Sequence, residues 1–276
     1  MEYQQDPWSG QPLGPYPGEQ PVPQTPQPVS PMPAENPVWS GWDVLQIAVL
    51  TVATIFILLL LIGIATQRIL QPSVGLMEVL KQPLISVFAQ LGAYVFILGF
   101  MVAVVKRVPG RKFWQEIKWL WPKSWSAYLM AGVIMSIALQ ALAHLLPMPK
   151  DLPIDRFFQT PQEAWILSIF GMTLAPLMEE LFFRGFLYPV LVRRLGIALA
   201  ILLTAAGFGL IHAPQLGRAW GPVLVVFLVG LTLTVTRAIT KSVAPGFLMH
   251  VAYNGTISVF IFIGTDGFRH LDRLAQ

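Results

Sequence analysis

The sequence predicts an all-α fold: a polytopic transmembrane helical bundle with a disordered N-terminal tail. Three observations carry this prediction. The chain of 276 residues is 55% hydrophobic and only 12% charged, which is about half the charged fraction of an ordinary soluble domain. Apolar runs near the length that a helix needs to cross a bilayer recur along the chain. A Pro- and Gln-rich stretch precedes them.

The predicted tail covers residues 1–37 and contains no Lys or Arg. Its composition cannot bury a core, so we expect a disordered, partly polyproline II segment. A passive tail is favoured over a docking ligand for a partner domain. The tail also lacks the basic region that begins a signal peptide. Residues 38–276 are then the transmembrane domain.

Seven apolar spans follow, at about 43–65, 84–105, 126–146, 163–187, 197–213, 222–238 and 243–264. Most are long enough to cross the hydrocarbon core as helices. The fifth is short and rich in Ala and Gly, and small residues let helix backbones approach closely, so it should lie inside the bundle. Dividing or merging runs among the last four would change the count by one, for example to eight.

Basic residues predict the orientation. One predicted side of the membrane receives 11 of the 18 Lys and Arg residues, namely Lys106, Arg107, Arg111, Lys112, Lys118, Lys123, Arg184, Arg193, Arg194, Arg237 and Lys241. Loops rich in Lys and Arg tend to be cytoplasmic. We therefore predict a multi-pass protein of the cell membrane with a cytoplasmic N-terminal tail.

The segment RKFWQEIKWLWPKSW, residues 111–125, interleaves tryptophan with cations. This pattern is typical of an interfacial segment on anionic lipid. Because the segment is short and lies between two spans, we predict the lipid bilayer as its partner and no nucleic acid.

Few ionisable residues lie within apolar sequence. They are Glu179, Glu180 and Arg184 in the fourth span, His212 at the end of the fifth and His250 in the seventh, where Asn254 adds an uncharged polar group. An ionised residue at the centre of a bilayer costs roughly 2.5–3.5 kcal/mol on insertion scales. Such residues face the bundle interior and pair with one another, so they predict a functional site.

Helical spacing separates the three charges of the fourth span. Glu180 and Arg184 are four residues apart, so they share a helix face and can form a structural ion pair. Glu179 lies about 100° round the helix and is not aligned with Arg184. Glu179 is therefore the predicted free carboxylate, available as a general base.

Two histidines and an asparagine complete the set. Phe208 and His212 are one turn apart on one face, and so are His250 and Asn254. Two His and one carboxylate match the inventory of a zinc-type hydrolytic site, and equally that of a metal-free Glu/His site that activates water. Asn254 can donate to a developing oxyanion. His144 and His270, outside these motifs, are predicted to be interfacial or solvated.

Other catalytic signatures are missing from the sequence. It has no HExxH, GxSxG, P-loop or GxGxxG motif. It also has no cysteine, which excludes disulfides, thiol nucleophiles and Cys-ligated metals.

Three motifs resemble a known family when they are taken together. Glu-Glu-x-x-x-Arg, Phe-x-x-x-His and His-x-x-x-Asn stand in that order at residues 179–184, 208–212 and 250–254, on the fourth, fifth and seventh apolar spans. They are similar to the motifs of the CPBP family, which comprises CAAX-processing proteases and bacteriocin-processing or immunity proteins (Abi proteins, type II CAAX prenyl endopeptidases). The resemblance covers about residues 160–264.

The resemblance implies an intramembrane endopeptidase with a water-accessible cavity and a membrane-associated peptide or protein substrate. It assigns water activation to Glu179, with His212 holding the water or a zinc ion. It gives oxyanion stabilisation to His250 and Asn254, with His250 as a ligand if zinc is bound. Glu180, Arg184 and Phe208 would support the site.

Two other functions fit the same residues. One is a non-catalytic membrane scaffold or bacteriocin-immunity protein, and the other is a proton-coupled transporter that uses the buried Glu and His as a relay. Against the transporter, no inverted repeat is evident. The oligomeric state, the substrate and its prenylation stay open. One geometric condition follows from the predicted spans. His212 can reach Glu179 only if the fourth span extends beyond residues 163–187, or if the fifth span is displaced or tilted.

Overall fold

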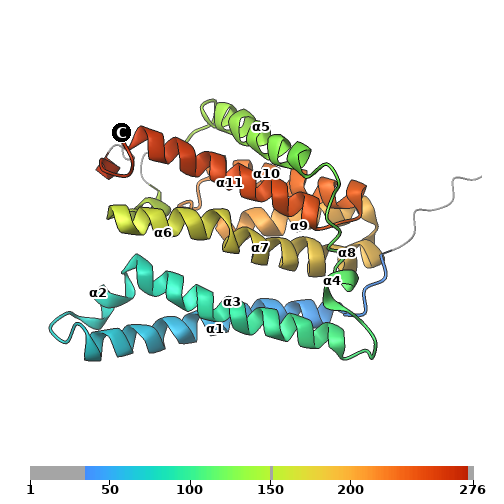
Figure 1. The fold of residues 1–276 in the computed structure, drawn as a ribbon, viewed down its shortest axis with the longest axis horizontal. Coiled ribbons are helices and arrows are strands. Elements are labelled where there is room, and N and C mark those ends of the chain that lie inside the picture. The colour runs from blue at the N-terminus through green and yellow to red at the C-terminus, as the bar shows by residue number, and fades with distance from the viewer. Residues whose placement is uncertain (1–34, 150–151, 273–276) are drawn as a thin grey trace, which may run out of the picture. The chain divides into compact units, whose positions relative to one another are not determined.

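The computed structural model describes residues 35–149 and 152–272, and all the regular elements in these ranges are helical (Figure 1). The predicted all-α class is therefore confirmed. In chain order the elements are α1 (Gly41–Ile69), α2 (Leu76–Leu80), α3 (Pro83–Lys106), α4 (Phe113–Glu116), α5 (Trp125–Ala143), the 3₁₀-helix η1 (Pro153–Phe157), α6 (Pro161–Met172), α7 (Leu174–Glu180), the π-helix η2 (Leu181–Leu187), α8 (Tyr188–Leu195), α9 (Ile197–His212), α10 (Trp220–Thr240) and α11 (Ala244–Gly264).

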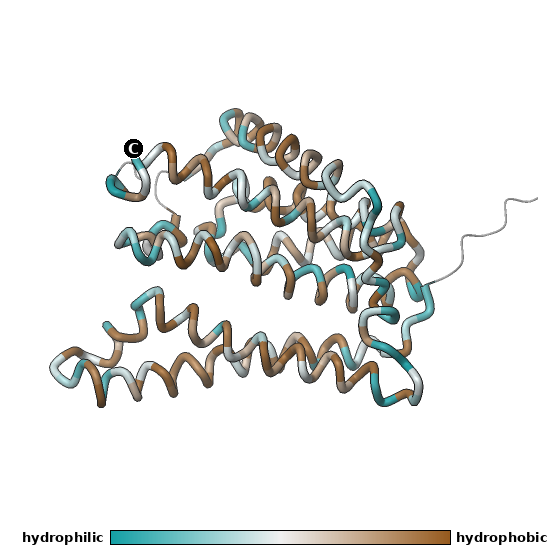
Figure 2. The backbone as a smooth tube through the Cα atoms, in the orientation of Figure 1, coloured by the Kyte–Doolittle hydropathy of each residue, from teal (hydrophilic) through white to brown (hydrophobic). Residues whose placement is uncertain are grey.

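Six helical segments of the described chain are long and apolar enough to cross a membrane. One of them, Pro161–Leu195, joins α6, α7, η2 and α8 into a single run of 35 residues. The predicted fifth span is the shorter apolar helix α9. Figure 2 shows that the long helices are mostly hydrophobic and that hydrophilic residues gather near their ends. The protein is thus a multi-pass membrane protein.

Local signals in the sequence explain where several helices begin and end. Ser40 and Asp43 form a capping box at the start of α1, and Thr160 and Glu163 form another at the start of α6. Each box satisfies main-chain N–H groups that the first turn leaves without helical partners. The long run ends at Gly196, whose φ of +80° favours glycine.

The helices pack mainly in pairs: α1 with α3, α5 with α11, and α9 with α10. Small residues bring the backbones of two of these pairs close together. A Cβ atom on Gly132 of α5 would overlap the Met249 carbonyl of α11, and one on Gly209 of α9 would lie 3.2 Å from Phe227 Cβ in α10. The Ala- and Gly-rich α9 is therefore packed against its neighbours, as its composition predicts.

The predicted tail extends too far at its C-terminal end. Glu35 and Pro37 are buried, and the Arg193 guanidinium donates to the Pro37 carbonyl at 3.1 Å. Glu35 forms ion pairs with Arg237 at 2.9 Å and with Lys118 at 3.4 Å. These partners are distant in sequence, so composition alone cannot reveal them. The rest of the predicted tail, residues 1–34, lies outside the described residues.

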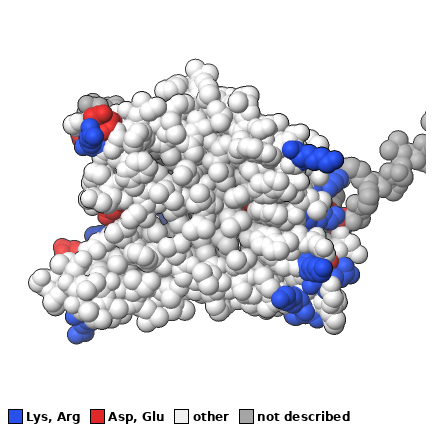
Figure 3. Space-filling model, viewed as in Figure 1, with Lys and Arg blue, Asp and Glu red and all other residues white. Residues whose placement is uncertain are grey.

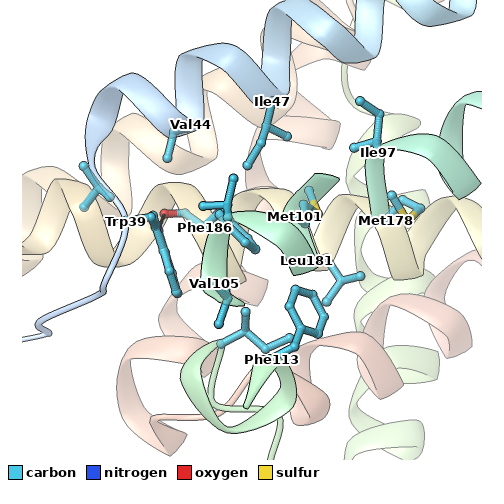
Figure 4. Close-up of a cluster of buried hydrophobic side chains, with 13 residues drawn as sticks. Trp39, Val44, Ile47, Ile97, Met101, Val105, Phe113, Met178, Leu181 and Phe186 are labelled. Carbon is cyan, nitrogen blue, oxygen red and sulfur yellow. Dashed lines mark hydrogen bonds between the residues drawn. The ribbon is translucent and has the colours of Figure 1, made fainter. Parts of the chain in front are cut away.

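A hydrophobic cluster lies where α1, α3, α4 and η2 meet (Figure 4). Within it, the rings of Trp39 and Phe186 are stacked with their centroids 4.4 Å apart. Both side chains are almost completely buried. The cluster therefore attaches the start of α1 to the helical run that carries the polar motif.

Lys and Arg side chains gather at the end of the molecule where α4 and α8 lie (Figure 3). Lys106, Arg111, Lys112, Lys123 and Arg194 are exposed there. Arg184, which the sequence assigns to the same side, is instead fully buried inside the bundle. We call this end of the molecule the basic end.

The ion pairs of Glu35 predict a pH dependence of stability. Burial raises the pKa of Glu35, but the charges and hydrogen bonds of Arg237 and Lys118 outweigh burial and leave this pKa below its ordinary value. The carboxylate therefore stabilises the fold fully above the unfolded-state pKa of about 4.3, and this contribution is lost as the pH falls through the folded-state pKa. In detergent, the melting temperature of the wild type should be higher than that of Glu35→Gln at pH 7. The difference between the two melting temperatures should shrink as the pH falls towards 3. A gap that does not change with pH would contradict this prediction.

Candidate active site

The polar motif lies where the long helical run changes its geometry. Glu179 and Glu180 are the last residues of α7, and Arg184 lies in the π-helix η2 that follows. A π-turn widens the helix by one residue per turn, and such turns are frequent at functional sites. The run is also interrupted at Thr173, whose backbone is not helical.

Glu180 is buried and paired. Its Oε1 atom accepts from Arg184 Nη1 at 2.7 Å and lies 3.0 Å from His250 Nδ1. Arg184 also donates to Thr234 Oγ1 at 3.2 Å and to the Gly230 carbonyl at 2.8 Å, both on α10. The predicted ion pair of Glu180 and Arg184 is therefore present, and it joins the fourth span to α10 and α11.

Glu179 faces both histidines of the motifs. Its Oε1 lies 3.8 Å from His212 Nε2, and its Oε2 lies 3.6 Å from His250 Nε2. The side chains of Glu179 and His212 are 19% and 20% exposed, whereas Glu180 is 0% exposed. Of the two glutamates, only Glu179 has exposed side-chain surface, and only Glu180 forms an ion pair with Arg184.

The meeting of Glu179 with His212 follows from the chain order. The described run extends to Leu195, eight residues beyond the predicted end of the fourth span, and α9 returns directly after Gly196. Glu179 stands 17 residues before Gly196 and His212 stands 16 residues after it. Two antiparallel helices joined by one turn bring residues that are equally far from the turn to the same level, because the rise per residue is constant. The predicted condition of a longer fourth span is met.

Local contacts orient the two imidazole rings. His212 Nδ1 lies 2.8 Å from the Phe208 carbonyl, which can only accept, so this nitrogen carries a proton. His250 Nδ1 faces Glu180 Oε1 in the same way. Phe208 packs against both rings, with centroids 4.8 Å from His212 and 5.7 Å from His250. Each Nδ1 is thereby occupied, and each Nε2 is directed at Glu179.

Asn254 is placed differently from the other predicted site residues. Its Nδ2 atom donates to the Gly171 carbonyl of α6 at 2.7 Å. Among the described residues, no hydrogen bond joins it to Glu179, His212 or His250. The amide nitrogen has a second hydrogen that this bond does not use.

Sequence reasoning missed three residues that contact the motif from other helices. Thr234 and Gly230 accept from Arg184, and Gly246 of α11 lies against Glu180. The sequence offered one signal for these contacts, namely a Thr four residues after a Gly in the sixth span, which places both on one helix face. His144 and His270, which fall outside the motifs, end α5 and follow α11, away from these contacts.

Gly246 leaves room for the buried carboxylate. A Cβ atom there would lie 3.0 Å from Glu180 Oε2. Gly246→Ala should therefore displace Glu180 and destabilise the fold by about 1–3 kcal/mol, as overpacking does. Gly255→Ala on the same helix is the control, because its Cβ would meet nothing within 4 Å. Thermal unfolding in detergent measures both, and equal melting temperatures would contradict the predicted crowding.

The structure and the site define a multi-pass membrane protein whose polar centre is built from one Glu-Glu-x-x-x-Arg segment and two histidine helices. Residues 161–256 match the model of a family described as Rce1-like, type II CAAX prenyl endopeptidase Rce1-like. The matched region contains all the motif residues, and the resemblance seen in the sequence is confirmed there. No match was found among curated proteins or among solved structures.

Proposed function

We propose that this protein is an intramembrane endopeptidase in which Glu179 activates the hydrolytic water. One observation carries the proposal: Glu179 is flanked by His212 and His250 at 3.8 and 3.6 Å, with part of its surface accessible. These separations exceed the length of a direct hydrogen bond. They suit a water molecule that contacts the carboxylate and an imidazole together. The family match supports an endopeptidase activity.

In the proposed reaction, water lies beside the Glu179–His212 pair and hydrogen-bonds to both the carboxylate and His212 Nε2. Glu179 removes one proton while the water oxygen bonds to the scissile carbonyl carbon. The proton is then transferred to the amide nitrogen as the C–N bond breaks, which releases a carboxylic acid and an amine. His212 orients the water, because its Nδ1–H is held by the Phe208 carbonyl.

The remaining motif residues would stabilise the oxyanion and hold the catalytic side chains in place. His250, when its Nε2 is protonated, and the unused N–H of Asn254 would donate to the oxyanion. Glu180 holds the His250 ring, as carboxylates do for many functional histidines. Arg184 compensates the charge of Glu180, and Phe208 packs against both rings.

Zinc stays a prediction for this site. In the described part of the chain, no group of three or more His, Cys, Asp or Glu side chains is placed so that it could hold a metal ion. His212 and His250 would be the ligands if the side chains moved together, and zinc would then polarise the carbonyl and the water. The steps above use only the residues of the chain.

We further propose that the substrate is a membrane-bound peptide or protein. We also propose that the protein lies in the cell membrane with its basic end on the cytoplasmic side. The cations at that end follow the positive-inside tendency. The matched family is described as type II CAAX prenyl endopeptidase Rce1-like, so a prenylated CAAX peptide is the first substrate to test.

The test uses the full chain in lipid nanodiscs with two peptides, one prenylated at a C-terminal CAAX sequence and one unmodified transmembrane segment. Mass spectrometry identifies any cut. We expect the wild type to cut at least one peptide and His212→Ala and His250→Ala to cut neither. Zinc removal by a chelator separates the two mechanisms: retained cleavage supports the metal-free reaction, and cleavage that returns only with added zinc supports the metal site.

Binding without cleavage would favour the scaffold or immunity function instead. If the wild type binds a peptide but never cuts it, with or without zinc, the proposal is wrong. Proton-driven uptake into vesicles that is lost in Glu179→Gln would favour the transporter.

A further inference from the structure

In the π-helix η2, the Arg184 carbonyl lacks its usual helical donor. Tyr188 N–H, the α-helical partner of the Arg184 carbonyl, donates instead to Phe183. The next residue along, Pro189, has no N–H. The Arg184 carbonyl must therefore find a donor elsewhere, because it is buried and an unpaired polar group there is costly.

Arg237 supplies that donor from the last turn of α10. Its Nε donates to the Arg184 carbonyl at 3.3 Å, and its Nη1 donates to Glu35 Oε1 at 2.9 Å. The guanidinium lies 5.3 Å from the centroid of the Tyr188 ring. Arg237 is 1% exposed. One buried cation therefore connects the segment before α1 to the backbone of the helix that carries the site.

Trp39 makes a second connection two residues further along the π-helix. Its Nε1–H donates to the Phe186 carbonyl at 2.9 Å, and its ring stacks on the Phe186 ring (Figure 4). The Trp39 carbonyl accepts in turn from Arg193 at 3.4 Å. Indole rings usually find a hydrogen-bond partner when buried, but here the partner is the helix of the proposed catalytic motif.

We infer that Glu35, Trp39 and Arg237, here called the clasp, are positioning residues for the site, a role that rests on the proposed endopeptidase function. They hold the Arg184 and Phe186 carbonyls. Arg184 in turn fixes Glu180, and Glu180 fixes His250. Among the interactions of the described residues, no hydrogen bond, ion pair or ring contact joins the clasp to Glu179, His212 or His250. The clasp acts through the π-helix, so the segment that precedes α1 sets the geometry of the proposed reaction.

Two substitutions remove single hydrogen bonds of the clasp. Arg237→Lys keeps a charge for Glu35, but one ammonium cannot reproduce the planar fork that reaches two acceptors. Trp39→Phe keeps a ring against Phe186 and removes the N–H. Exposed positions give matched controls: Arg68→Lys in the last turn of α1, and Trp42→Phe, where the tryptophan is 65% exposed.

Two measurements are made on each full-length variant in nanodiscs. The first is kcat, KM and the pH–rate profile with the peptide that the wild type cuts. The second is hydrogen exchange of the amides in residues 181–188, compared with the rest of the chain.

We expect kcat to fall by about tenfold in Arg237→Lys and by a few-fold in Trp39→Phe, since small misplacements of catalytic groups have effects of this order. KM should stay within about twofold of wild type because the clasp residues lie outside the proposed site. The pH–rate profile should move, which a smaller amount of folded protein could not cause. Exchange in residues 181–188 should accelerate, and both controls should match wild type.

Unchanged kcat and unchanged exchange in both clasp variants would overturn the inference. If Arg237→Lys does not fold, Trp39→Phe and Glu35→Gln decide the matter by the same criteria. A wild type that cuts no peptide refutes the proposed function, while faster exchange confined to residues 181–188 would still support the clasp as a device that orders this helix. A wild type that cuts, with variants that cut equally fast, refutes the clasp alone.

Discussion

Glu179→Gln is expected to abolish most of the cleavage, with kcat/KM lowered on the order of a thousandfold. The amide has nearly the same shape as the carboxylate but cannot take a proton from water. It still lies between His212 and His250, so binding and folding should change little. Cleavage of the peptide by the purified variant, beside its melting curve, measures both effects.

The control for this prediction is Glu78→Gln, which removes an exposed carboxylate from α2. It should cut at the wild-type rate. A Glu179→Gln protein that retains full activity would remove Glu179 from the mechanism. A Glu179→Gln protein that fails to insert or unfolds early would show that the residue is structural.

The second large effect concerns stability. Arg184→Ala leaves Glu180 buried without its cation, and breaking a buried ion pair by removing one partner costs about 3–5 kcal/mol. Arg184 also donates to α10 through Thr234 and Gly230, so helix packing should loosen as well. Chemical unfolding in mixed micelles should show a strongly destabilised or unfolded variant.

A double variant separates charge balance from catalysis. Glu180→Leu with Arg184→Met removes both charges together, and apolar replacement of a buried pair is often neutral for stability. We expect much of the stability to return. Activity should stay low, because His250 Nδ1 then has no carboxylate to hold it. Arg184→Ala with wild-type stability, or the double variant with full activity, would contradict this account.

The sequence predicted the parts of the site that depend on spacing within one helix. Glu180 and Arg184 are one turn apart and form an ion pair, and the rings of Phe208 and His212 are in contact, as their shared face predicts. Helix existence was also predictable, because the hydrophobic runs are long. Orientation in the membrane and the roles of the site residues stay predictions that need experiments.

Other features depend on contacts that no local pattern records. The π-helix replaces the expected α-helix after Glu180, and its carbonyls are paired by Arg237 and Trp39 from distant parts of the chain. Glu35 was assigned to the tail because it lies at the end of a Pro- and Gln-rich stretch, yet its buried partners decide its place. Asn254 shares a face with His250 in sequence, but its amide donates to α6.

The central claim is that the protein hydrolyses peptide bonds of membrane-associated substrates with Glu179 as the general base. The most direct measurement compares the membrane peptides of cells that produce the wild type with those of cells that produce equal amounts of Glu179→Gln, by mass spectrometry of newly formed chain ends. We predict a set of cleavage products that is present with the wild type and absent with Glu179→Gln. Identical peptide sets in the two cell lines would contradict the claim.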